Sequence, residues 1–388
     1  MQIIYVSSLT EEKKMNYIIR HSKKKPLQSI QKFHRLVCEG LAKNGADVKT
    51  ISSIPMSRAI SNKIIWIDKK QKENEVEYNY IPFINLKILR QISTFLGTLI
   101  MTINECIKGR KEKVFICDLL NTTISSTVLI LSKILKFKCI AIVTDLPRDI
   151  GKKNSVSRKI NEALQNKYDA YIMLTEAMNE VINKKNKPSI VIEGMVDINM
   201  KQQINTLENK YKEKVCIYAG GLYEKYGVKN LIEAFKLIKK DDIRLHIYGT
   251  GELENYLNEI NDNRIKYFGV IENEKVVMEE LKATLLINPR FSNAEYTKYS
   301  FPSKNMEYMS TGTPILTTKL PGMPKEYYKY VYLFEDESVE GMKEKIEEIL
   351  DKNLIELHQN GQEARKFVLE EKNNIIQTRK IFDMELCK

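Results

Sequence analysis

Apolar and polar positions alternate along the chain in two different patterns. Short apolar, β-branched runs of strand length are separated by longer stretches whose apolar positions recur at helical spacing. In the first half of the chain the strand-like runs are residues 3–6, 48–51, 114–117, 139–143, 170–174 and 190–192. Helix-like stretches lie between them, for example residues 27–44 and 122–135. This alternation predicts a parallel sheet covered by helices.

The second half repeats the pattern after a polar, charged stretch at residues 197–214. Its strand-like runs are residues 215–219, 244–248, 265–268, 285–288, 315–317 and 331–334. We therefore predict an α/β fold with two Rossmann-like, doubly wound domains that face each other across a cleft. The predicted boundaries are residues 1–197 for the N-terminal domain, 198–370 for the C-terminal domain, and 371–388 for a C-terminal helix that could pack on either domain, including back on the N-terminal one. Ligands of such domains bind at the carboxyl ends of the strands, so the chemistry is expected in the loops that follow them.

Charge narrows the partners that the chain can have. Its 388 residues fit two domains, and its net charge of +12 favours anionic partners. The candidates are nucleic acid, anionic lipid headgroups and phosphorylated small molecules. Lysines cluster at residues 23–25, 69–72 and 184–187, but no aromatic residues are interleaved with them as in a single-strand binding platform. We therefore expect no nucleic-acid partner.

Residues 81–103 are the most membrane-like stretch of the sequence. Lys87 and Arg90 interrupt them, so the stretch is not expected to cross a bilayer. Its apolar positions recur at helical spacing, at Ile88, Ile92, Phe95, Leu96 and Leu99. The spacing fits a helix packed in a domain core or a helix lying on an anionic membrane surface. Of the two, we expect packing in the core.

The cysteines and histidines point to a reduced protein without a metal. Six cysteines are scattered singly, and three of them lie inside strand-like runs, which indicates a cytoplasmic location. The chain starts with a predicted strand and not with a signal peptide. The four histidines are far apart in the sequence, so no metal site is expected.

The segment 299–316 has the strongest local pattern for a binding site. Pro302 and Ser303 are typical of a helix start, and Gly312 is typical of a left-handed helix end, which predicts a short helix between two strands. Free backbone N–H groups at its start favour a phosphate, and Lys304 adds a positive charge. Glu307, one turn later, can accept hydrogen bonds from ribose hydroxyls. The alternative is a plain helix start with a surface carboxylate.

A second candidate site follows the first strand of the C-terminal domain. The strand ends in Gly220 and Gly221, and a loop with Lys225 and Gly227 leads into an amphipathic helix. Glycines allow backbone to approach an anion, and the lysine can neutralise it. The alternative is a tight turn. A further glycine turn at residues 246–251 is interpreted as structural.

Together these segments resemble the retaining, two-domain (GT-B) glycosyltransferases of family 4, especially bacterial enzymes that build exopolysaccharide, capsule or O-antigen. Residues 218–235 resemble the glycine loop and following helix of that family, and residues 302–314 resemble its pattern Pro-Ser-Lys-x-x-Glu-Tyr-Met-x-x-Gly-x-Pro. The resemblance implies that a nucleotide-sugar donor is bound by Gly220, Gly221, Lys225, Ser303, Lys304 and Glu307. It also implies that Lys304 stabilises the leaving diphosphate.

The chain departs from the family pattern at four positions in three regions: the glycine loop, the segment before Glu307, and the N-terminal domain. Gly221 stands where the family usually has an arginine, and Tyr226 occupies the usual lysine position, with Lys225 next to it. Tyr299 lies eight residues before Glu307, where the family has its first glutamate. Glu295 lies further upstream and could replace that glutamate only if the segment folds back.

The third of these regions is the N-terminal domain. Thr144 stands where the family has a cleft histidine, which leaves Asp145 as the polar residue best placed to touch an acceptor hydroxyl or the transferred sugar. We therefore count Asp145 with Lys304 as candidate catalytic residues.

The resemblance implies a retaining transferase for surface polysaccharide synthesis. Its donor would be a UDP- or GDP-sugar, used as a substrate without a separate cofactor, and its acceptor would be lipid-linked or a saccharide. The location implied is cytoplasmic, with peripheral attachment to the inner face of the plasma membrane. Two alternatives remain open at this point: a nucleotide-sugar epimerase of the same fold, and a non-catalytic scaffold subunit.

Overall fold

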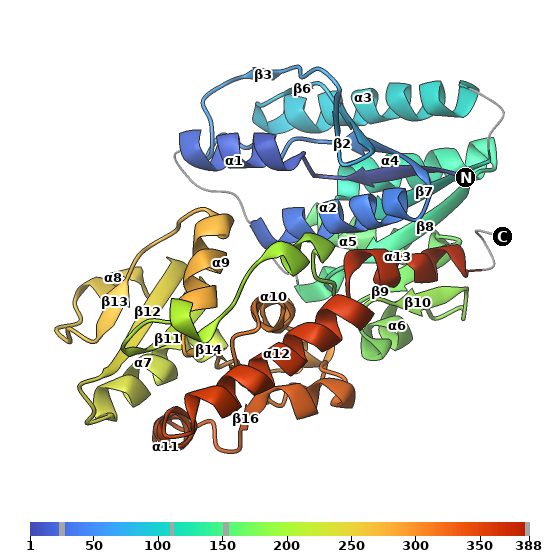
Figure 1. The fold of residues 1–388 in the computed structure, drawn as a ribbon. Coiled ribbons are helices and arrows are strands. Elements are labelled where there is room, and N and C mark those ends of the chain that lie inside the picture. Colours follow the sequence, from blue (N-terminus) through green and yellow to red (C-terminus); the bar gives the residue numbers. More distant parts are fainter. Residues whose placement is uncertain (23–27, 109–111, 150–154, 385–388) are drawn as a thin grey trace. The chain divides into compact units, whose positions relative to one another are not determined.

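The computed structural model describes residues 1–22, 28–108, 112–149 and 155–384, and the chain forms two compact units (Figure 1). The N-terminal unit comprises Met1–Met195 and Asn374–Lys388, and the C-terminal unit comprises Val196–Asn373. The predicted boundaries were residues 197 and 370. The lysine cluster at residues 23–25 and Cys387 lie outside the described residues.

An eight-stranded sheet forms the centre of the N-terminal unit. Its order is β10-β9-β8-β7-β1-β2-β5-β4, and every neighbouring pair is parallel except β4 and β5. The strands are β1 (Gln2–Ser7), β2 (Asp47–Ser52), β4 (Gln71–Glu73), β5 (Val76–Tyr80), β7 (Lys113–Asp118), β8 (Lys138–Val143), β9 (Ala170–Met173) and β10 (Ser189–Val191). A short antiparallel pair is formed by β3 (Ile65–Trp66) and β6 (Phe83–Ile84).

Seven helices belong to the described part of the N-terminal unit: α1 (Glu12–His21), α2 (Gln28–Lys43), α3 (Lys87–Ile107), α4 (Thr122–Leu135), α5 (Val156–Leu164), α6 (Glu176–Ile182) and α13 (Asn374–Phe382). The last of these, α13, packs against α2. Asn44 fixes this contact, because its side-chain Nδ2 donates to the Ile375 carbonyl at 2.7 Å. The C-terminal helix is thus part of the N-terminal unit.

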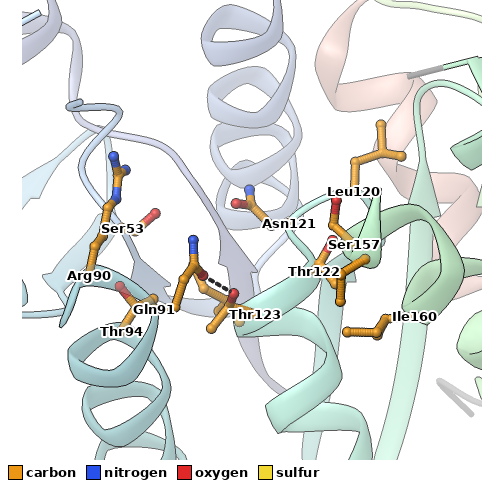
Figure 2. A pocket seen from close by; sticks show the side chains of 12 residues that line it. Ser53, Arg90, Gln91, Thr94, Leu120, Asn121, Thr122, Thr123, Ser157 and Ile160 are labelled. Carbon is orange, nitrogen blue, oxygen red and sulfur yellow. Dashed lines mark hydrogen bonds between the residues drawn. The ribbon is translucent and has the colours of Figure 1, made fainter. Parts of the chain in front are cut away.

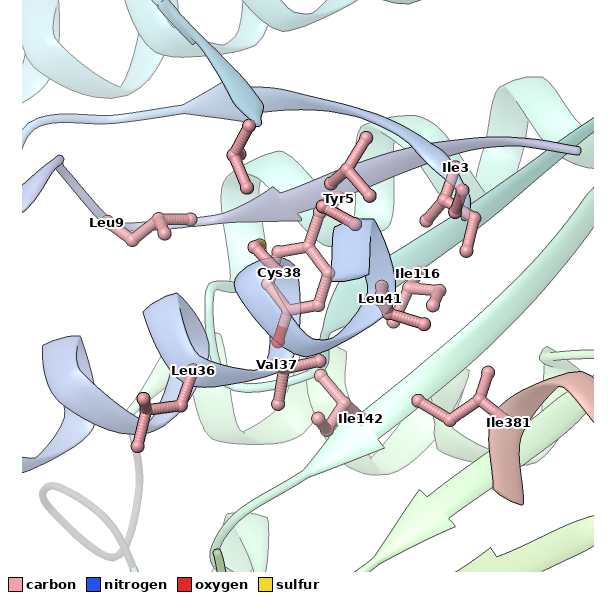
Figure 3. Close-up of a cluster of buried hydrophobic side chains, with 14 of the residues drawn as sticks. Ile3, Tyr5, Leu9, Leu36, Val37, Cys38, Leu41, Ile116, Ile142 and Ile381 are labelled. Atoms are coloured by element: carbon pink, nitrogen blue, oxygen red, sulfur yellow. The ribbon is translucent and has the colours of Figure 1, made fainter. Parts of the chain in front are cut away.

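Figure 3 shows the core between α2, α13 and the strands of this unit. Leu36 and Leu41 of α2 meet Tyr5 of β1, Ile142 of β8 and Ile381 of α13, and all five are at most 2% exposed. Each fully buried side chain of this size contributes about 1.5–3 kcal/mol to the free energy of unfolding. The apolar runs in the sequence therefore identify β1, β2, β7, β8, β9 and β10 correctly, whereas β3, β4, β5 and β6 were not predicted.

The prediction that the apolar positions of residues 81–103 pack in the core is wrong. The helix forms, as α3, but Ile88, Ile92, Phe95 and Leu96 are 72%, 50%, 43% and 48% exposed. Spacing alone identifies an apolar face, and it does not say on which side of the helix the domain lies. None of the helices in the part of the chain that the structure describes is long and apolar enough to cross a membrane.

The C-terminal unit has a six-stranded parallel sheet of order β13-β12-β11-β14-β15-β16. Its strands are β11 (Lys214–Gly221), β12 (Ile243–Thr250), β13 (Ile265–Tyr267), β14 (Leu285–Asn288), β15 (Ile315–Thr318) and β16 (Tyr332–Phe334). Its helices are α7 (Val228–Leu237), α8 (Glu254–Asn258), α9 (Asn273–Lys282), α10 (Ser303–Thr311), α11 (Val339–Leu350) and α12 (Leu354–Glu371). Separate apolar clusters cover the two faces of the sheet.

Candidate active site

The predicted nucleotide-binding residues lie in loops at the carboxyl edge of the C-terminal sheet. Here β11 and β12 end together, with Gly220 paired to Gly249 and Gly221 paired to Thr250. Gly249 has a φ of +132°, and a Cβ at this position would lie 1.8 Å from the Gly220 carbonyl oxygen. Only glycine allows the two strand ends to lie this close.

The loop after β11 is held against the loop after β14. Lys225 lies in the 3-10 helix Glu224–Tyr226, and Gly227 follows it with a φ of +73°. A Cβ on Gly227 would lie 1.9 Å from the Pro289 carbonyl oxygen, so the two loops touch backbone to backbone. This contact holds Arg290, the residue after Pro289, beside the glycine loop.

Two cations lie over one tyrosine ring in this region. The Arg290 guanidinium carbon is 4.6 Å from the centroid of the Tyr226 ring, and Lys225 Nζ is 5.2 Å from the same centroid. Neither cation pairs with a carboxylate among the described residues. Both positive charges are therefore available to an anionic ligand.

The segment between β14 and α10 folds back onto the glycine loop. Its 3-10 helix Glu295–Lys298 carries Tyr296, whose hydroxyl donates to the Lys225 carbonyl at 3.4 Å. The rings of Tyr296 and Tyr226 are 6.4 Å apart. Glu295 is exposed on the same 3-10 helix, and Tyr299 follows it. The 3-10 helix that carries Glu295 thus lies against the glycine loop through Tyr296.

Helix α10 begins at Ser303 after Pro302 and ends before Gly312, whose φ is +75°. The prediction of a short helix with a left-handed glycine at its end is confirmed. No side chain caps its first turn, where the exposed Ser303 and the half-buried Lys304 lie. Backbone N–H groups of a first turn have no partner within the helix and can bind an anion.

A buried polar network fixes the start of α10 to two strand ends. Asn288 of β14 donates from Nδ2 to Asn305 Oδ1 at 2.7 Å. Asn305 Nδ2 donates to Thr317 Oγ1 of β15 at 3.2 Å, and Thr317 Oγ1 donates to the Asn288 carbonyl at 3.1 Å. Because each of these buried groups is bonded, the network holds the start of α10 rigidly at the sheet edge.

Tyr308 ties the same helix to the end of β11. Its hydroxyl accepts from the Ala219 backbone N–H at 2.7 Å and lies 3.3 Å from the Ala219 carbonyl. The side chain is fully buried, and burial raises the pKa of Tyr308 well above its ordinary value. The phenol thus stays neutral and positions α10 next to Gly220 and Gly221.

Lys304 and Glu307 form an ion pair on α10. Lys304 Nζ is 2.8 Å from Glu307 Oε2, and the two side chains are 28% and 14% exposed. Desolvation lowers the pKa of Lys304, but the attraction of Glu307 and of the buried Glu280 outweighs it, so the net shift is upward. Lys304 is therefore firmly charged. The sequence predicted separate partners for these side chains, and in the structure they also contact each other.

A hollow of about 570 Å³ in the C-terminal unit is lined by β12, the loop after β13, and α9. The rings of Tyr248 and Phe268 are stacked in its wall, with centroids 4.9 Å apart and planes within 11°. Phe268 is 44% exposed and Met278 is 49% exposed. The wall thus offers a flat, apolar surface next to Lys275.

Asp145 lies in the N-terminal unit, two residues after the end of β8. It is half-buried, and it follows the buried Thr144. The residues that the sequence predicts to bind the nucleotide-sugar donor all lie in the C-terminal unit. Among the described residues, no group of three or more His, Cys, Asp or Glu side chains could hold a metal ion.

The comparisons with known proteins agree with this architecture. Residues 199–367 match the family model of glycosyl transferases group 1, so the C-terminal unit carries a glycosyltransferase group 1 domain. No curated protein sequence matches the chain.

Solved structures match over nearly the whole chain. Sucrose-phosphate synthase from Thermosynechococcus elongatus has a TM-score of 0.72 at 13% identity, with 99% of this chain and 98% of that one covered. HepE from Anabaena, in complex with UDP and glucose, has a TM-score of 0.66 at 12% identity, with the same coverage. The lipopolysaccharide outer core galactosyltransferase WaaB has a TM-score of 0.61 at 13% identity, again with 99% and 98% coverage. The predicted GT-B fold is confirmed.

Sequence reasoning did not identify the residues that hold α10 in place. Asn288, Asn305 and Tyr308 were not among the predicted site residues, although they fix the helix on which Lys304 lies. A signal was available, because Asn305 and Tyr308 stand three residues apart in a short helix and so share one face. Polar atoms on a buried face need partners, and strand ends supply them.

Proposed function

We propose that the protein is a retaining glycosyltransferase that moves a sugar from a UDP- or GDP-sugar to a lipid-linked or saccharide acceptor. The observation that carries the proposal is the uncapped start of α10, with the charged Lys304 in its first turn, held at the sheet edge beside Gly220, Gly221 and Arg290. The glycosyl transferases group 1 domain covers this whole region.

The diphosphate of the donor binds at the first turn of α10, at Ser303 and Lys304, and against the backbone of Gly220 and Gly221. Lys225 supplies a further positive charge from the loop after β11. The exposed ring of Phe268, stacked on the buried Tyr248, offers a surface for the nucleobase. Glu307 holds the ribose hydroxyls, which requires its ion pair with Lys304 to open when the donor binds.

In the transfer, the bond between the anomeric carbon and the diphosphate oxygen breaks, and a bond from the acceptor oxygen to the same face of that carbon forms. The acceptor hydroxyl proton passes to the leaving diphosphate. Negative charge therefore grows on the diphosphate, where Lys304, Lys225 and Arg290 stabilise it. Asp145 of the N-terminal unit contacts the acceptor hydroxyl or the transferred sugar.

We place the reaction in surface polysaccharide synthesis, in the cytoplasm and peripheral to the inner face of the plasma membrane. The resemblance to family 4 enzymes of that class supports the pathway. The net charge of +12 and the exposed apolar face of α3 support the peripheral attachment.

Two linked measurements test the proposed function. A thermal-shift screen with UDP, GDP, ADP and CMP identifies the nucleotide, because a ligand bound to the folded state raises the melting temperature. The corresponding nucleotide sugar is then incubated with the protein, and NMR follows released nucleoside diphosphate and the anomeric configuration of the product. We expect release with retention. Sugar interconversion without release would identify an epimerase, and the absence of both stabilisation and turnover would identify a scaffold.

A further inference from the structure

Helix α3 turns its polar side inward and its apolar side outward. Thr94, Thr98 and Thr102 face the domain and are at most 6% exposed. The outward side carries seven large apolar residues, each more than 40% exposed: Ile88, Leu89, Ile92, Phe95, Leu96, Ile100 and Ile107. A surface helix of a soluble domain has the opposite arrangement. The outward side of α3 is therefore built to be covered.

The exposed apolar surface continues onto the two neighbouring helices. Helix α3 packs against α4, and α4 packs against α5. On α4, Ile130, Ile134 and Leu135 are 53%, 67% and 45% exposed, and on α5, Val156 and Ile160 are 73% and 37% exposed. We call these residues and the seven of α3 the apolar face. Large exposed apolar patches of this kind mark interaction sites.

Positive charges outnumber negative ones around the apolar face. Helix α3 has one acidic residue, Glu105, which is 14% exposed; α4 has none, and α5 has Glu162, which pairs with Arg158 at 2.8 Å. Exposed lysines lie at the ends of α3 and α4: Lys87, Lys108, Lys133 and Lys136, of which Lys108 pairs with Glu105 and Lys133 with Asp169. Apolar residues flanked by lysines are typical of surfaces that lie in one leaflet of an anionic membrane.

A pocket of about 580 Å³ opens where α3, α4 and α5 begin (Figure 2). Its polar wall includes Arg90 and Gln91 of α3, Thr123 of α4, and Ser157 of α5. Thr123 donates its hydroxyl hydrogen to Gln91 Oε1, which links α3 to α4 across the pocket. Its apolar wall includes Ile160, which also belongs to the apolar face. The pocket and the apolar face are thus one continuous surface.

Arg90 gives this pocket a positive charge that the described residues do not neutralise. Its guanidinium carbon lies 5.1 Å from the centroid of the Phe83 ring. No carboxylate among the described residues pairs with it. Partial burial lowers the pKa of Arg90, as expected for a cation without an acidic partner. A guanidinium binds a phosphate with two parallel hydrogen bonds.

We propose that this surface binds a phosphate-bearing lipid, with the phosphate in the pocket beside Arg90 and the hydrocarbon chain among the leaflet lipids that cover the apolar face. The occupant is an anionic lipid because the surface combines apolar residues, an excess of lysines over carboxylates, and the partly buried Arg90, which no carboxylate among the described residues neutralises. This inference rests on the proposed function: in that reaction, such a lipid carries the acceptor hydroxyl. The acceptor class is therefore a lipid-linked phosphate.

Vesicle sedimentation tests the apolar half of the proposal. The full chain should bind phosphatidylcholine vesicles that contain phosphatidylglycerol far more tightly than vesicles of phosphatidylcholine alone, and salt should weaken the binding. Ile88→Ser should weaken it about tenfold, because an apolar side chain is no longer buried in the leaflet. Ile204→Ser is the matched control, since Ile204 of the C-terminal unit is also 72% exposed. Equal effects of the two substitutions would overturn the membrane contact.

Arg90→Gln tests the pocket, with Arg58→Gln as the control of equal charge on an exposed residue of the same unit. Arg90→Gln should weaken binding to the anionic vesicles about fivefold, and Arg58→Gln should leave it nearly unchanged. Inorganic phosphate at millimolar concentration should not displace the protein, because the hydrocarbon contacts remain. Full displacement would mean that the pocket binds free phosphate and not lipid, and equal effects of the two arginine substitutions would overturn the headgroup site.

Calorimetric titration of the same variants with the preferred nucleoside diphosphate separates this proposal from the proposed function. Unchanged nucleotide affinity together with lost vesicle binding locates the defect in the lipid surface. A protein that binds vesicles but no nucleotide would refute the proposed function and leave the lipid surface standing. A protein that binds nucleotide but no anionic vesicle would refute the lipid surface alone.

Discussion

Replacing Lys304 with alanine should weaken nucleoside diphosphate binding about tenfold and slow sugar transfer roughly a hundredfold. Lys304 lies in the uncapped first turn of α10 and is kept charged by Glu307 and Glu280. In the ground state it contributes one charge-assisted contact to the diphosphate. In the transition state the same contact strengthens, because charge grows on the leaving group, so kcat should fall more than affinity. Calorimetry and initial rates measure the two effects separately.

Lys345→Ala is the matched control for this prediction. Lys345 pairs with Glu348 at 2.9 Å, three residues later on α11, as Lys304 pairs with Glu307 on α10. The control therefore removes an ion pair of the same spacing away from the sheet edge. If both variants bind and turn over alike, the effect belongs to a helix ion pair and Lys304 has no role at the diphosphate.

Gly227→Ala should be among the most damaging single substitutions in the C-terminal unit. The new Cβ would lie 1.9 Å from the Pro289 carbonyl oxygen, on a residue with a φ of +73°. Left-handed strain costs about 1–2 kcal/mol, and forcing two backbones apart adds roughly 1–3 kcal/mol to the loss in free energy of unfolding. Nucleotide affinity should fall as well, because Arg290 follows Pro289 and would move with it. Denaturant titration and calorimetry measure the two losses.

Gly269→Ala separates the two causes. Gly269 has a similar φ of +68°, but a Cβ there meets nothing within 4 Å. This variant should show the strain alone, about 1–2 kcal/mol. Equal losses in the two variants would mean that the loops after β11 and β14 do not touch as described.

The fold could be predicted because the apolar runs that form the central strands of both sheets are buried. Ile3 and Ile4 in β1, Ile140 in β8 and Leu285 in β14 are completely buried, and the helical stretches between such runs cover the sheets. The glycine at the end of α10 could be predicted for a similar reason. Gly312 needs a positive φ, and the helix pattern stops at that residue.

The orientation of α3 could not be predicted from its period. A helix with apolar residues along one side has the same sequence pattern whether that side meets the core or a membrane. What decides it is the opposite side: Thr98 and Thr102 are completely buried, and Thr98 satisfies its hydroxyl by donating to the Thr94 carbonyl at 2.7 Å. Threonines can line the inner side of a helix in this way, and a pattern that counts only apolar residues does not register them.

The candidate site was only partly accessible to sequence reasoning, because its geometry depends on contacts between distant segments. The pattern of residues 299–316 gave the helix and its charges. It could not give the position of Arg290 over Tyr226, which depends on two loops touching at Gly227 and Pro289. The ion pair between Lys304 and Glu307 is different, because residues three apart on a helix are neighbours and the sequence contains this spacing. It was missed because each side chain was given a separate part of the donor as its partner.

The central claim is that α10 holds a nucleotide, with the diphosphate at its start and the ribose at Glu307. The most direct test is a calorimetric cycle with wild type and Glu307→Gln, each titrated with the preferred nucleoside diphosphate and with its 2′-deoxy form. Glu348→Gln serves as the control, since Glu348 is the acidic partner of the equivalent pair on α11. We predict that removing the 2′-hydroxyl costs wild type about tenfold in affinity and costs Glu307→Gln much less, because both changes remove the same hydrogen bond. Additive losses, or equal losses in all three proteins, would show that Glu307 does not contact the ribose and would contradict the account.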